Sequence, residues 1–444
     1  MRMFLAIVVC KILRFIGKLV GKGSSLPGKY ALKVCPDVLR RVKLPEYIIA
    51  VTGSNGKTST VEMIASVLRR SGKTVVYNAE GSNQIEGVAT LVLCSSTVTG
   101  RMKGDVLLLE SDERYARLSF RWFHPTHFVI TNLYRDQLTR NGHPEWVYDA
   151  VKDAIYGDTT LVLNADDPLV SCFARGHEKV KWFGLDRCAV SSDEHRGVYH
   201  DGALCPVCGG AMEYSCYHYE HIGHYRCESC GHCRHETDFA VTSLDLEGGT
   251  LTLDGETEIS LAFKSIYNVY NILAAWSVCR LAGVDRETAA SVISNYILKN
   301  GRMVRFTLAG HRGTLLTSKH ENSVAYDTNL GYIADTKKPC QVLIIVDAIS
   351  RKYFTGETSW LWDINFDLLC CEPVKKVILC GKYVHDLALR FDCTAVPAEK
   401  VVCCGTVAQA AGMLAEDGGE EDLYVVTCFS DRDKLLSLVK KEEE

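Results

Sequence analysis

The sequence contains two CxxC pairs, CPVCGG and CESCGH, which place cysteines at Cys205, Cys208, Cys227 and Cys230. Each CxxC forms a tight knuckle that directs two thiolates toward one point, and two knuckles complete a tetrahedral Zn²⁺ site. Because four thiolates leave no open coordination position, we expect a structural zinc that stabilises an insertion too small for its own core. Five nearby histidines are alternative ligands: His218, His221, His224, His232 and His235.

A second candidate site is the stretch VTGSNGKTST (51–60), which follows an apolar run and precedes a helical pattern. In this context backbone N–H groups close around phosphate oxygens, and the helix dipole favours the negative charge. Lys57 would reach the β- and γ-phosphates of ATP, and the Thr58 hydroxyl would bind Mg²⁺. The loop is shorter than a standard Walker A motif, and an ordinary turn is the alternative. The residues expected to bind the nucleotide here are Gly53, Asn55, Gly56, Lys57, Thr58 and Ser59.

Acidic residues follow another apolar run, in DVLLLESDE (105–113). Glu110 leaves the run first, so we expect it to bind Mg²⁺ directly or through water. Asp112 and Glu113 come close behind, and three acids at one strand end would repel one another without a cation. A solvated turn is the alternative for Asp112 and Glu113.

The stretch SWLWDINFDLL (359–369) places Asp363 and Asp367 among large apolar side chains. A carboxylate in such surroundings orients a histidine, holds a cation, pairs with an arginine or binds local backbone amides. The sequence alone leaves these roles open. Trp360 and Trp362 flank Asp363 and are of a type that is common in protein interfaces.

Parallel strands that alternate with helices must position these residues. Short β-branched runs that end at polar or glycine-rich residues predict strands at 47–51, 74–77, 105–110, 127–131 and 160–164. This alternation predicts a parallel sheet with binding loops at the carboxyl ends of its strands. Residues 186–255 interrupt the pattern with little periodicity. A second α/β series then predicts strands at 341–346, 376–380, 400–404 and 422–427.

A chain of 444 residues is too long for a single core, so we expect several parts. Residues 1–45 form a basic helical segment. Residues 46–310 form a central ATP-binding domain that carries the cysteine-rich insertion at about 200–240. Residues 311–444 form a smaller C-terminal α/β domain.

The first 45 residues contain ten Lys or Arg and a single acid, although the formal net charge of the whole chain is −4. Four basic residues fall on one helical stripe, at Lys11, Arg14, Lys18 and Lys22. Such a helix either lies on an anionic membrane surface or docks on its own domain with the stripe in water. No apolar run reaches the roughly 18–20 residues that span a bilayer, and no signal-peptide pattern is present. The twenty cysteines are therefore expected in a reducing cytoplasm.

Several motifs follow one another as in the Mur ligases, which use ATP to form an acyl phosphate that an amine attacks. They are TGSNGKTS, the strand ending in Glu110, TNLYRDQLTRNG (131–142), LNADDP (163–168), YNVYNILAA (267–275) and GRMVRF (301–306). The resemblance implies that Asn268 contacts the adenine and that Arg302 faces the phosphates. It also implies that Asp166 or Asp167 lies near the nucleoside.

One departure concerns the metal. Gln137 follows Asp136 at a position where the amino-acid-adding Mur ligases have histidine. No counterpart of their carbamylated lysine is found either. A second Mg²⁺ is therefore held differently here, or is absent.

The segments GKGSSLPGKYAL, SWLWDINFD and VILCGKYVHDLALR, together with the cysteine-rich insertion, resemble the MurT family. These are the synthetase subunits of lipid II isoglutaminyl synthase, and they form heterodimers with the glutaminase GatD. The resemblance implies an α/β fold: a Mur-ligase-type P-loop central domain with an inserted Cys₄ zinc ribbon, followed by a smaller C-terminal α/β domain. It implies ATP- and Mg²⁺-dependent amidation of the D-glutamate α-carboxylate in the lipid II stem peptide, with ammonia from a GatD-like subunit.

In the same family the aspartate at the position of Asp363 completes the Cys–His pair of the partner. We therefore expect Asp363, Lys57 and Glu110 to be the catalytic residues, Trp360 and Trp362 to be interface anchors, and Asp367 to be structural. The expected location is the cytoplasm, at the inner face of the membrane if the N-terminal helix binds there.

Two alternatives remain. The first is a stand-alone Mur or folylpolyglutamate-type ligase that joins an amino acid, and the second is a non-catalytic partner that has kept a nucleotide fold. Gln137 and the zinc ribbon favour the amidotransferase subunit over the first, and intact Lys57, Thr58 and Glu110 argue against the second. No glutaminase nucleophile is evident, because the cysteines of VILCGK and VVCCGT lack the preceding glycine and are expected in the core. Residues 325–358 depart from the family pattern and leave the acceptor open.

Overall fold

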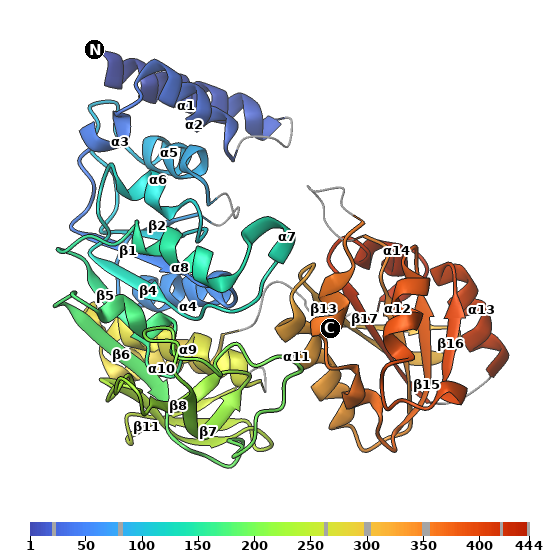
Figure 1. Cartoon of the computed structure of the whole chain (residues 1–444). Helices are drawn as coiled ribbons and strands as arrows, with labels where there is room; N and C mark the ends of the chain where they lie inside the picture. Colours follow the sequence, from blue (N-terminus) through green and yellow to red (C-terminus); the bar gives the residue numbers. More distant parts are fainter. Residues whose placement is uncertain are drawn as a thin grey trace. The chain divides into compact units, whose positions relative to one another are not determined.

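The computed structural model describes residues 1–19, 24–78, 83–261, 265–296, 303–348, 356–417 and 421–441. The chain divides into two compact units (Figure 1). The first comprises Met1–Tyr134, Pro144–Arg196 and His200–Leu298, and the second comprises Arg135–His143, Gly197–Tyr199 and Lys299–Glu444. The second unit begins before the expected boundary at residue 311, because strand β12 (Met303–Leu308) pairs with β13 (His311–Ser318).

The first unit is built on a nine-stranded sheet with the order β11-β10-β9-β6-β5-β4-β1-β3-β2. Strands β2 to β9 of this order pair in parallel, and β10 and β11 are added antiparallel at one edge. Strand β1 lies between β3 and β4, which is the point where the strand order reverses and where such sheets bind ligands. The bounds are β1 (Tyr47–Thr52), β2 (Val75–Tyr77), β3 (Val106–Glu110), β4 (His127–Ile130), β5 (Thr160–Asn164), β6 (Val180–Leu185), β9 (Phe239–Asp245), β10 (Thr250–Leu253) and β11 (Thr257–Ser260).

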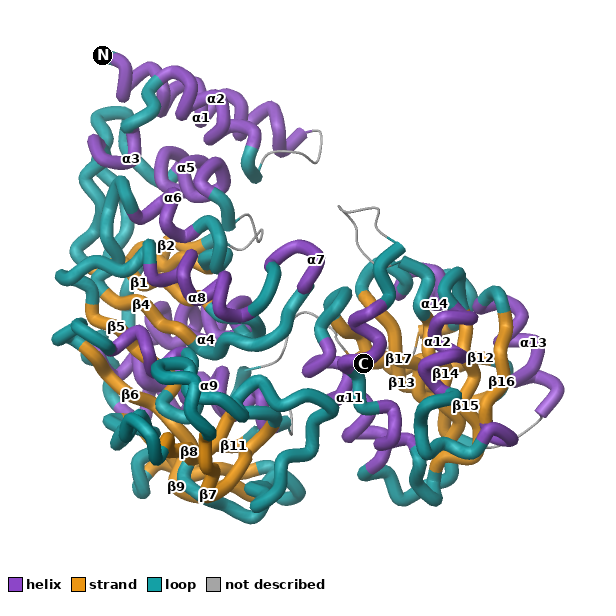
Figure 2. The backbone as a smooth tube through the Cα atoms, viewed as in Figure 1, coloured by secondary structure: helices purple, strands orange, loops and turns teal. Residues whose placement is uncertain are grey.

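Helices cover both faces of this sheet (Figure 2). Alternate residues of β1 point to opposite sides: Ile49 and Val51 join one core, and Ile48 and Ala50 join the other. The first core is closed by α4 (Lys57–Arg70), α9 (Ile266–Leu281) and α10 (Arg286–Ser294). The second is closed by α1 (Arg2–Leu19), α2 (Leu26–Val34), α3 (Val38–Arg41), α5 (Ile85–Cys94), α6 (Ala116–Phe120), α8 (Pro144–Lys152) and the 3₁₀ helix η1 (Val170–Ala174).

The basic N-terminal segment is part of the first unit. Ala6, Ile7 and Cys10 of α1 are fully buried, and α1 packs against α2 and α5. The Lys11 amine donates to the Cys94 carbonyl of α5 at 3.1 Å. The helix therefore docks on its own domain, which was one of the two interpretations. Across the described ranges, no helix has both the length and the hydropathy that crossing a membrane requires.

The region 186–255 is more regular than its sequence indicates. It holds the hairpin of β7 (Met212–Tyr219) and β8 (Ile222–Cys227), and also β9 and β10 of the main sheet. The low periodicity of this region in the sequence did not reveal these strands. The pairings of β7 with β8 and of β9 with β10 contain register shifts, and such bulges interrupt the alternation by which a strand is recognised.

The second unit has a seven-stranded sheet with the order β16-β15-β14-β17-β13-β12-β18. Its five strands from β16 to β13 are parallel, as the second α/β series predicts. The remaining strands are β14 (Cys340–Ile345), β15 (Val374–Cys380), β16 (Val401–Cys404), β17 (Asp422–Cys428) and β18 (Lys440–Lys441). Its helices are α7 (Leu138–Asn141), α11 (Ser323–Ala334), α12 (Val384–Phe391), α13 (Val407–Asp417) and α14 (Arg432–Leu436), with 3₁₀ helices η2 (Ser359–Asp363), η3 (Phe366–Leu369) and η4 (Ala398–Lys400).

Candidate functional site

The glycine-rich loop lies between β1 and α4, at the carboxyl edge of the first sheet, as the sequence predicts. Gly53 and Gly56 have φ angles of 139° and 87°, a region that favours glycine. A Cβ atom at Gly56 would lie 1.9 Å from the Asn271 Oδ1, and one at Gly53 would lie 2.1 Å from the Thr131 Oγ1. Only glycine fits at either position, because a side chain there would collide with Thr131 or Asn271.

The first turn of α4 presents the charged and hydroxyl groups of the loop. The Lys57 side chain is buried, donates to the Gly53 carbonyl and forms an ion pair with Glu113. Thr58 is exposed and Ser59 is half-buried. The arrangement places one fixed cation and two hydroxyls at a helix N-terminus, where a phosphate chain and its metal bind.

Three acids lie at the end of the neighbouring strand. Glu110 is the last residue of β3 and lies beside Val51 in the register with β1, which brings it next to the loop. Glu110, Asp112 and Glu113 are 9%, 3% and 5% exposed. The solvated turn considered for Asp112 and Glu113 is therefore wrong, because both are buried in the site.

Residues after β4 hold the loop in place, a role that the sequence analysis did not assign to the motif that begins at Thr131. The Asn55 amide donates to the Asn132 Oδ1 at 2.9 Å, and the Asn132 Nδ2 donates back to the Asn55 carbonyl at 3.3 Å. The Thr131 hydroxyl donates to the same carbonyl at 3.0 Å. The signal was present in the sequence, since the pair TN directly follows a predicted strand.

Helix α9 supplies two asparagines on one face, three residues apart. Asn268 is buried in the first turn of the helix. Asn271 lies against Gly56, and sequence reasoning missed it. The adenine contact of Asn268 stays a prediction. Arg302 lies outside the described residues.

Asp166 and Asp167 are fully buried, and their carboxylates accept hydrogen bonds from other residues of the chain. Asp166 accepts from the Arg234 Nε at 2.6 Å, the Leu185 amide at 2.7 Å and the Tyr270 hydroxyl at 2.7 Å. Asp167 accepts from the amides of Leu133, Leu169 and Val170 at 2.8–3.0 Å. Burial raises the pKa of Asp167. Both acids thus tie β5 to its neighbours, and the nucleoside contact of Asp166 stays a prediction.

The four cysteines of the CxxC pairs come together, with the four sulfur atoms within 4.8 Å of one another. Cys205 and Cys230, and likewise Cys208 and Cys227, lie 3.6 Å apart at Sγ. Tetrahedral zinc with Zn–S bonds of about 2.3 Å requires a spacing of about 3.8 Å between thiolates. The amides of Val207 and Gly210 point to the sulfur atoms of Cys205 and Cys208 at 3.4 Å. No histidine joins this group in the part of the chain that is described.

The SWLWD motif forms η2 in the second unit. The Asp363 Oδ1 accepts from the Arg135 guanidinium at 2.8 Å, and the two side chains are 19% and 24% exposed. The same guanidinium lies 4.1 Å over the ring of Tyr199. Of the roles left open for Asp363, the structure shows the pairing with an arginine.

The two tryptophans of this motif differ. Trp360 is 4% exposed and packs against Tyr326 in the core of the second unit, whereas Trp362 is 45% exposed. The expectation that Trp360 anchors an interface was therefore wrong, because it is enclosed by its own unit. Asp367 accepts from the Ala395 amide at 2.7 Å, which agrees with a structural role.

The sequence also gave no weight to KHEN (319–322) at the end of β13. Glu321 accepts from the amide and the hydroxyl of Thr139, at 3.0 and 2.8 Å. Asn322 donates to Asp136 at 2.7 Å, and Lys319 lies 3.4 Å from the same carboxylate. Burial raises the pKa of Glu321. These residues fix the segment around Gln137, which adopts a left-handed conformation with φ of 50°.

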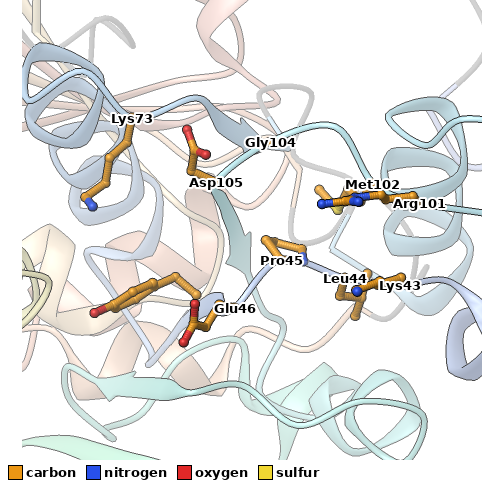
Figure 3. A pocket seen from close by; sticks show the side chains of 10 residues that line it. Lys43, Leu44, Pro45, Glu46, Lys73, Arg101, Met102, Gly104 and Asp105 are labelled. Atoms are coloured by element: carbon orange, nitrogen blue, oxygen red, sulfur yellow. The ribbon is translucent and has the colours of Figure 1, made fainter.

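A surface depression in the first unit lies away from this chemistry (Figure 3). It is lined by Lys43, Glu46, Lys73, Arg101 and Asp105 among others. Tyr47 and Val106 begin β1 and β3 directly beside it, so it lies at the amino ends of the strands. Ligands of doubly wound sheets bind at the carboxyl ends, and we assign no function to this depression.

Comparisons with known proteins agree with this geometry. The profile of the Mur ligase middle domain matches residues 51–203, and that of the MurT ligase C-terminal domain matches residues 320–431. The lipid II isoglutaminyl synthase (glutamine-hydrolyzing) subunit MurT of Streptococcus pneumoniae (strain ATCC BAA-255 / R6) is 31% identical over 397 residues, which cover 87% of this chain and 86% of that protein. The chain belongs to the MurT family.

The MurT subunit of Staphylococcus aureus (strain N315) is 27% identical over 405 residues and 90% of each chain. Solved structures show the Mur-ligase fold of this MurT-family chain. A pseudomurein peptide ligase type C from Methanothermus fervidus superposes with a TM-score of 0.69 at 20% identity, over 91% of this chain and 80% of that one. MurF from Acinetobacter baumannii gives a TM-score of 0.64 at 16% identity, over 92% and 80%.

Proposed function

We propose that this chain is the synthetase subunit of a glutamine-hydrolysing amidotransferase that acts on lipid II. A carboxylate oxygen of the D-glutamate residue attacks the γ-phosphorus of ATP, and ADP leaves. Ammonia then attacks the carbonyl carbon of the acyl phosphate, phosphate leaves, and D-isoglutamine remains. The observation that carries this proposal is the sequence identity of 27% and 31% with MurT subunits, over 90% and 87% of the chain. The glycine-rich loop of the first unit supports it.

The loop residues fit ATP and Mg²⁺. Gly53 and Gly56 adopt positive φ angles in a turn that leads from β1 into the N-terminus of α4, which suits a phosphate chain at the helix N-terminus. Lys57 would bind the β- and γ-phosphates, and Thr58 and Glu110 would hold Mg²⁺, which offsets phosphate charge when bound. Lys57 exchanges its ion pair with Glu113 for the phosphate, so that the cation is positioned before the nucleotide arrives.

The four cysteines fit a structural Zn²⁺. Their sulfur spacing and the amides directed at them match a closed tetrahedral site. Such an ion would hold the β7–β8 hairpin and the two knuckles together, since this segment buries few apolar side chains of its own.

The nitrogen is supplied by a second protein, a GatD-like glutaminase subunit. Burial raises the pKa of the Cys380 and Cys404 thiols, which makes both poor nucleophiles. Cys403 is exposed, in contrast to the core position expected for it. Asp363 is the residue offered to the partner: it is part-exposed and stands beside the exposed Trp362. There it would orient a histidine base and stabilise its protonated form.

The outer face of α1 would place the chain at the membrane that holds its lipid-linked substrate. Opposite the buried face of the helix, six apolar side chains are 51–75% exposed: Phe4, Leu5, Ile12, Phe15, Ile16 and Leu19. Arg2 and Lys18 of the same helix are exposed. An apolar stripe with basic flanks is typical of helices that lie in the interface of anionic bilayers.

Co-sedimentation with vesicles tests the membrane contact. Phe15→Asp with Ile16→Asp should reduce binding to vesicles that contain anionic lipid at least tenfold. Leu389→Asp on α12, where the leucine is 58% exposed, is the matched control and should leave binding unchanged. Equal binding of all three proteins, or none by the unmodified chain, would contradict the contact.

Amidation of lipid II tests the function. The purified chain with its glutaminase subunit should convert lipid II to the amidated form with ATP and glutamine, and the chain alone should do so with ATP and ammonium. Mass spectrometry of the product distinguishes an amide from an added amino acid. ATP-dependent addition of an amino acid, without amidation, would establish the stand-alone ligase instead.

A further inference from the structure

A second group of metal-binding side chains lies on the β7–β8 hairpin, apart from the Cys₄ cluster. Among the described residues, Cys216, His218 and His224 bring one ligand atom each to within 4.8 Å of one another. Cys216 lies opposite His224 in the strand register, and the register shifts both before Cys216 and between Tyr217 and Tyr219. Such bulges redirect side chains, here toward one point.

The hydrogen bond of His224 leaves a lone pair on its ring for a metal, and that of His218 does so when its Nδ1 donates to the Ser191 hydroxyl. The His224 Nε2 lies 2.9 Å from the Leu185 carbonyl, which can only accept, so Nε2 carries the proton and Nδ1 the lone pair. The His218 Nδ1 lies 3.0 Å from the Ser191 hydroxyl. Metal-binding histidines in proteins are held by such second hydrogen bonds.

The Nε2 atom of His218 is unusual for a histidine in a protein core, because buried polar atoms normally form a hydrogen bond. His218 is 7% exposed, and its Nε2 is buried without a hydrogen-bond partner among the described residues. A buried polar atom without a hydrogen-bond partner is unfavourable. Cys216 beside it is fully buried. A cation bound between them satisfies the nitrogen and the thiolate together.

We propose that Cys216 Sγ, His218 Nε2 and His224 Nδ1 bind a second Zn²⁺, with the fourth position taken by water or a small anion. Mixed sulfur and imidazole ligands in a tetrahedral site are typical of zinc. Two histidines and one cysteine also suit copper, which the measurement below distinguishes. The inference does not depend on the proposed function. The count of two zinc ions in the test below takes the Cys₄ cluster as the first site.

This ion would connect the insertion to the ATP-binding sheet. Its ligands hydrogen-bond to Leu185, the last residue of β6, and to Ser191 in the loop that follows. That loop pairs with β7, where Ser192 and Tyr217 exchange hydrogen bonds of 2.8 and 2.7 Å. The Leu185 amide in turn binds Asp166, which accepts from Tyr270 of α9. The site therefore supports the helix that carries Asn268 and Asn271.

Metal analysis of the full-length chain tests the site. By elemental mass spectrometry, the unmodified protein should carry two zinc ions per chain. The variants Cys216→Ser, His218→Gln and His224→Gln should each carry one. Cys208→Ser should retain the second ion. Two matched controls, Cys403→Ser on β16 and His385→Gln on α12, replace exposed residues of the second unit and should keep both ions.

Cobalt substitution identifies the ligands independently of stability. A Co²⁺ ion bound by Cys216 gives a sulfur-to-cobalt absorption. This absorption should persist when Cys205, Cys208, Cys227 and Cys230 are all changed to Ser, and it should disappear when Cys216→Ser is added. If circular dichroism shows that a variant does not fold, the release of zinc from the unmodified chain to a chelator is measured instead. Release of two ions per chain in two kinetic phases would support the site. One zinc per chain, absent from Cys208→Ser and unchanged in Cys216→Ser, would overturn the proposal, as would copper in place of the second zinc.

Discussion

Among the described residues, each unit has an ion pair that contains a proposed catalytic residue, Lys57 in the first and Asp363 in the second, and these two pairs differ in burial. The side chains of Lys57 and Glu113 are 9% and 6% exposed, whereas those of Arg135 and Asp363 are 24% and 19% exposed. The first pair joins a phosphate loop to the end of the adjacent strand. The second joins the loop around Gln137 to a 3₁₀ helix beside an exposed tryptophan.

The difference in exposure suits the two proposed roles. Lys57 is buried, as expected of a charge that binds a ligand, and Asp363 is part-exposed, as expected of a charge that contacts another protein. A buried cation such as Lys57 has lost its hydration. Its anionic partner can therefore be replaced only by another anion, such as a phosphate, without a large cost in free energy. A part-exposed pair contributes about 1 kcal/mol or less and is screened by salt. Under the proposed function, Asp363 would exchange its pairing with Arg135 for a histidine of the partner.

Replacing the buried cation should have the largest effect. Lys57→Ala removes the charge that stabilises the transferred phosphoryl group, and it should lower the rate of amidation on the order of 10³-fold with either nitrogen source. The measurement is ADP release with lipid II and ammonium.

Lys73→Ala is the matched control, since Lys73 lies at the amino edge of the same sheet in the depression of Figure 3. It should keep normal activity. An equal loss in both variants would show that the depression, and not the glycine-rich loop, is the site.

The two tryptophans should separate fold from interface. Trp360→Ala leaves a cavity in the second unit and should lower its free energy of unfolding by about 3–5 kcal/mol. Trp362→Ala should leave unfolding almost unchanged and weaken partner binding by about 2 kcal/mol, roughly 30-fold in Kd. Thermal unfolding and binding titration measure the two effects, and the reverse pattern would contradict the assignment of Trp362 to the interface.

The smallest effect is expected from Arg135→Ala. Loss of the part-exposed pair should change the free energy of unfolding by about 1 kcal/mol or less, and high salt should remove most of the difference from the unmodified chain. Ammonium-dependent amidation should stay within a few-fold of normal. A loss comparable with that of Lys57→Ala would mean that Arg135 belongs to the ligand site.

The parts of the site that local sequence determines could be predicted. The glycine-rich turn, Lys57 and the two cysteine knuckles each lie within a few residues, so spacing alone fixes their geometry. The strand ends that carry Glu110 and the loop also follow from β-branched runs that stop at polar residues. These predictions needed no tertiary contact.

Features that depend on distant partners could not be predicted. The pairing of Asp363 with Arg135 joins residues 228 positions apart. Packing between separate elements likewise determines the hydrogen bonds of Asp166 with Arg234 and Tyr270, and the burial of Trp360. Strands β9 and β10 were missed because their pairing contains a register shift, which interrupts the alternation by which a strand is recognised.

The division of labour between two proteins is tested most directly by Asp363→Asn. This substitution keeps the size of the side chain and removes its charge, so the ratio of glutamine-dependent to ammonium-dependent amidation, measured in the presence of the glutaminase subunit, should fall at least 100-fold. Asp367→Asn, four residues away on an acid that binds the Ala395 amide, should leave that ratio unchanged. A ratio that stays the same in Asp363→Asn would contradict the account.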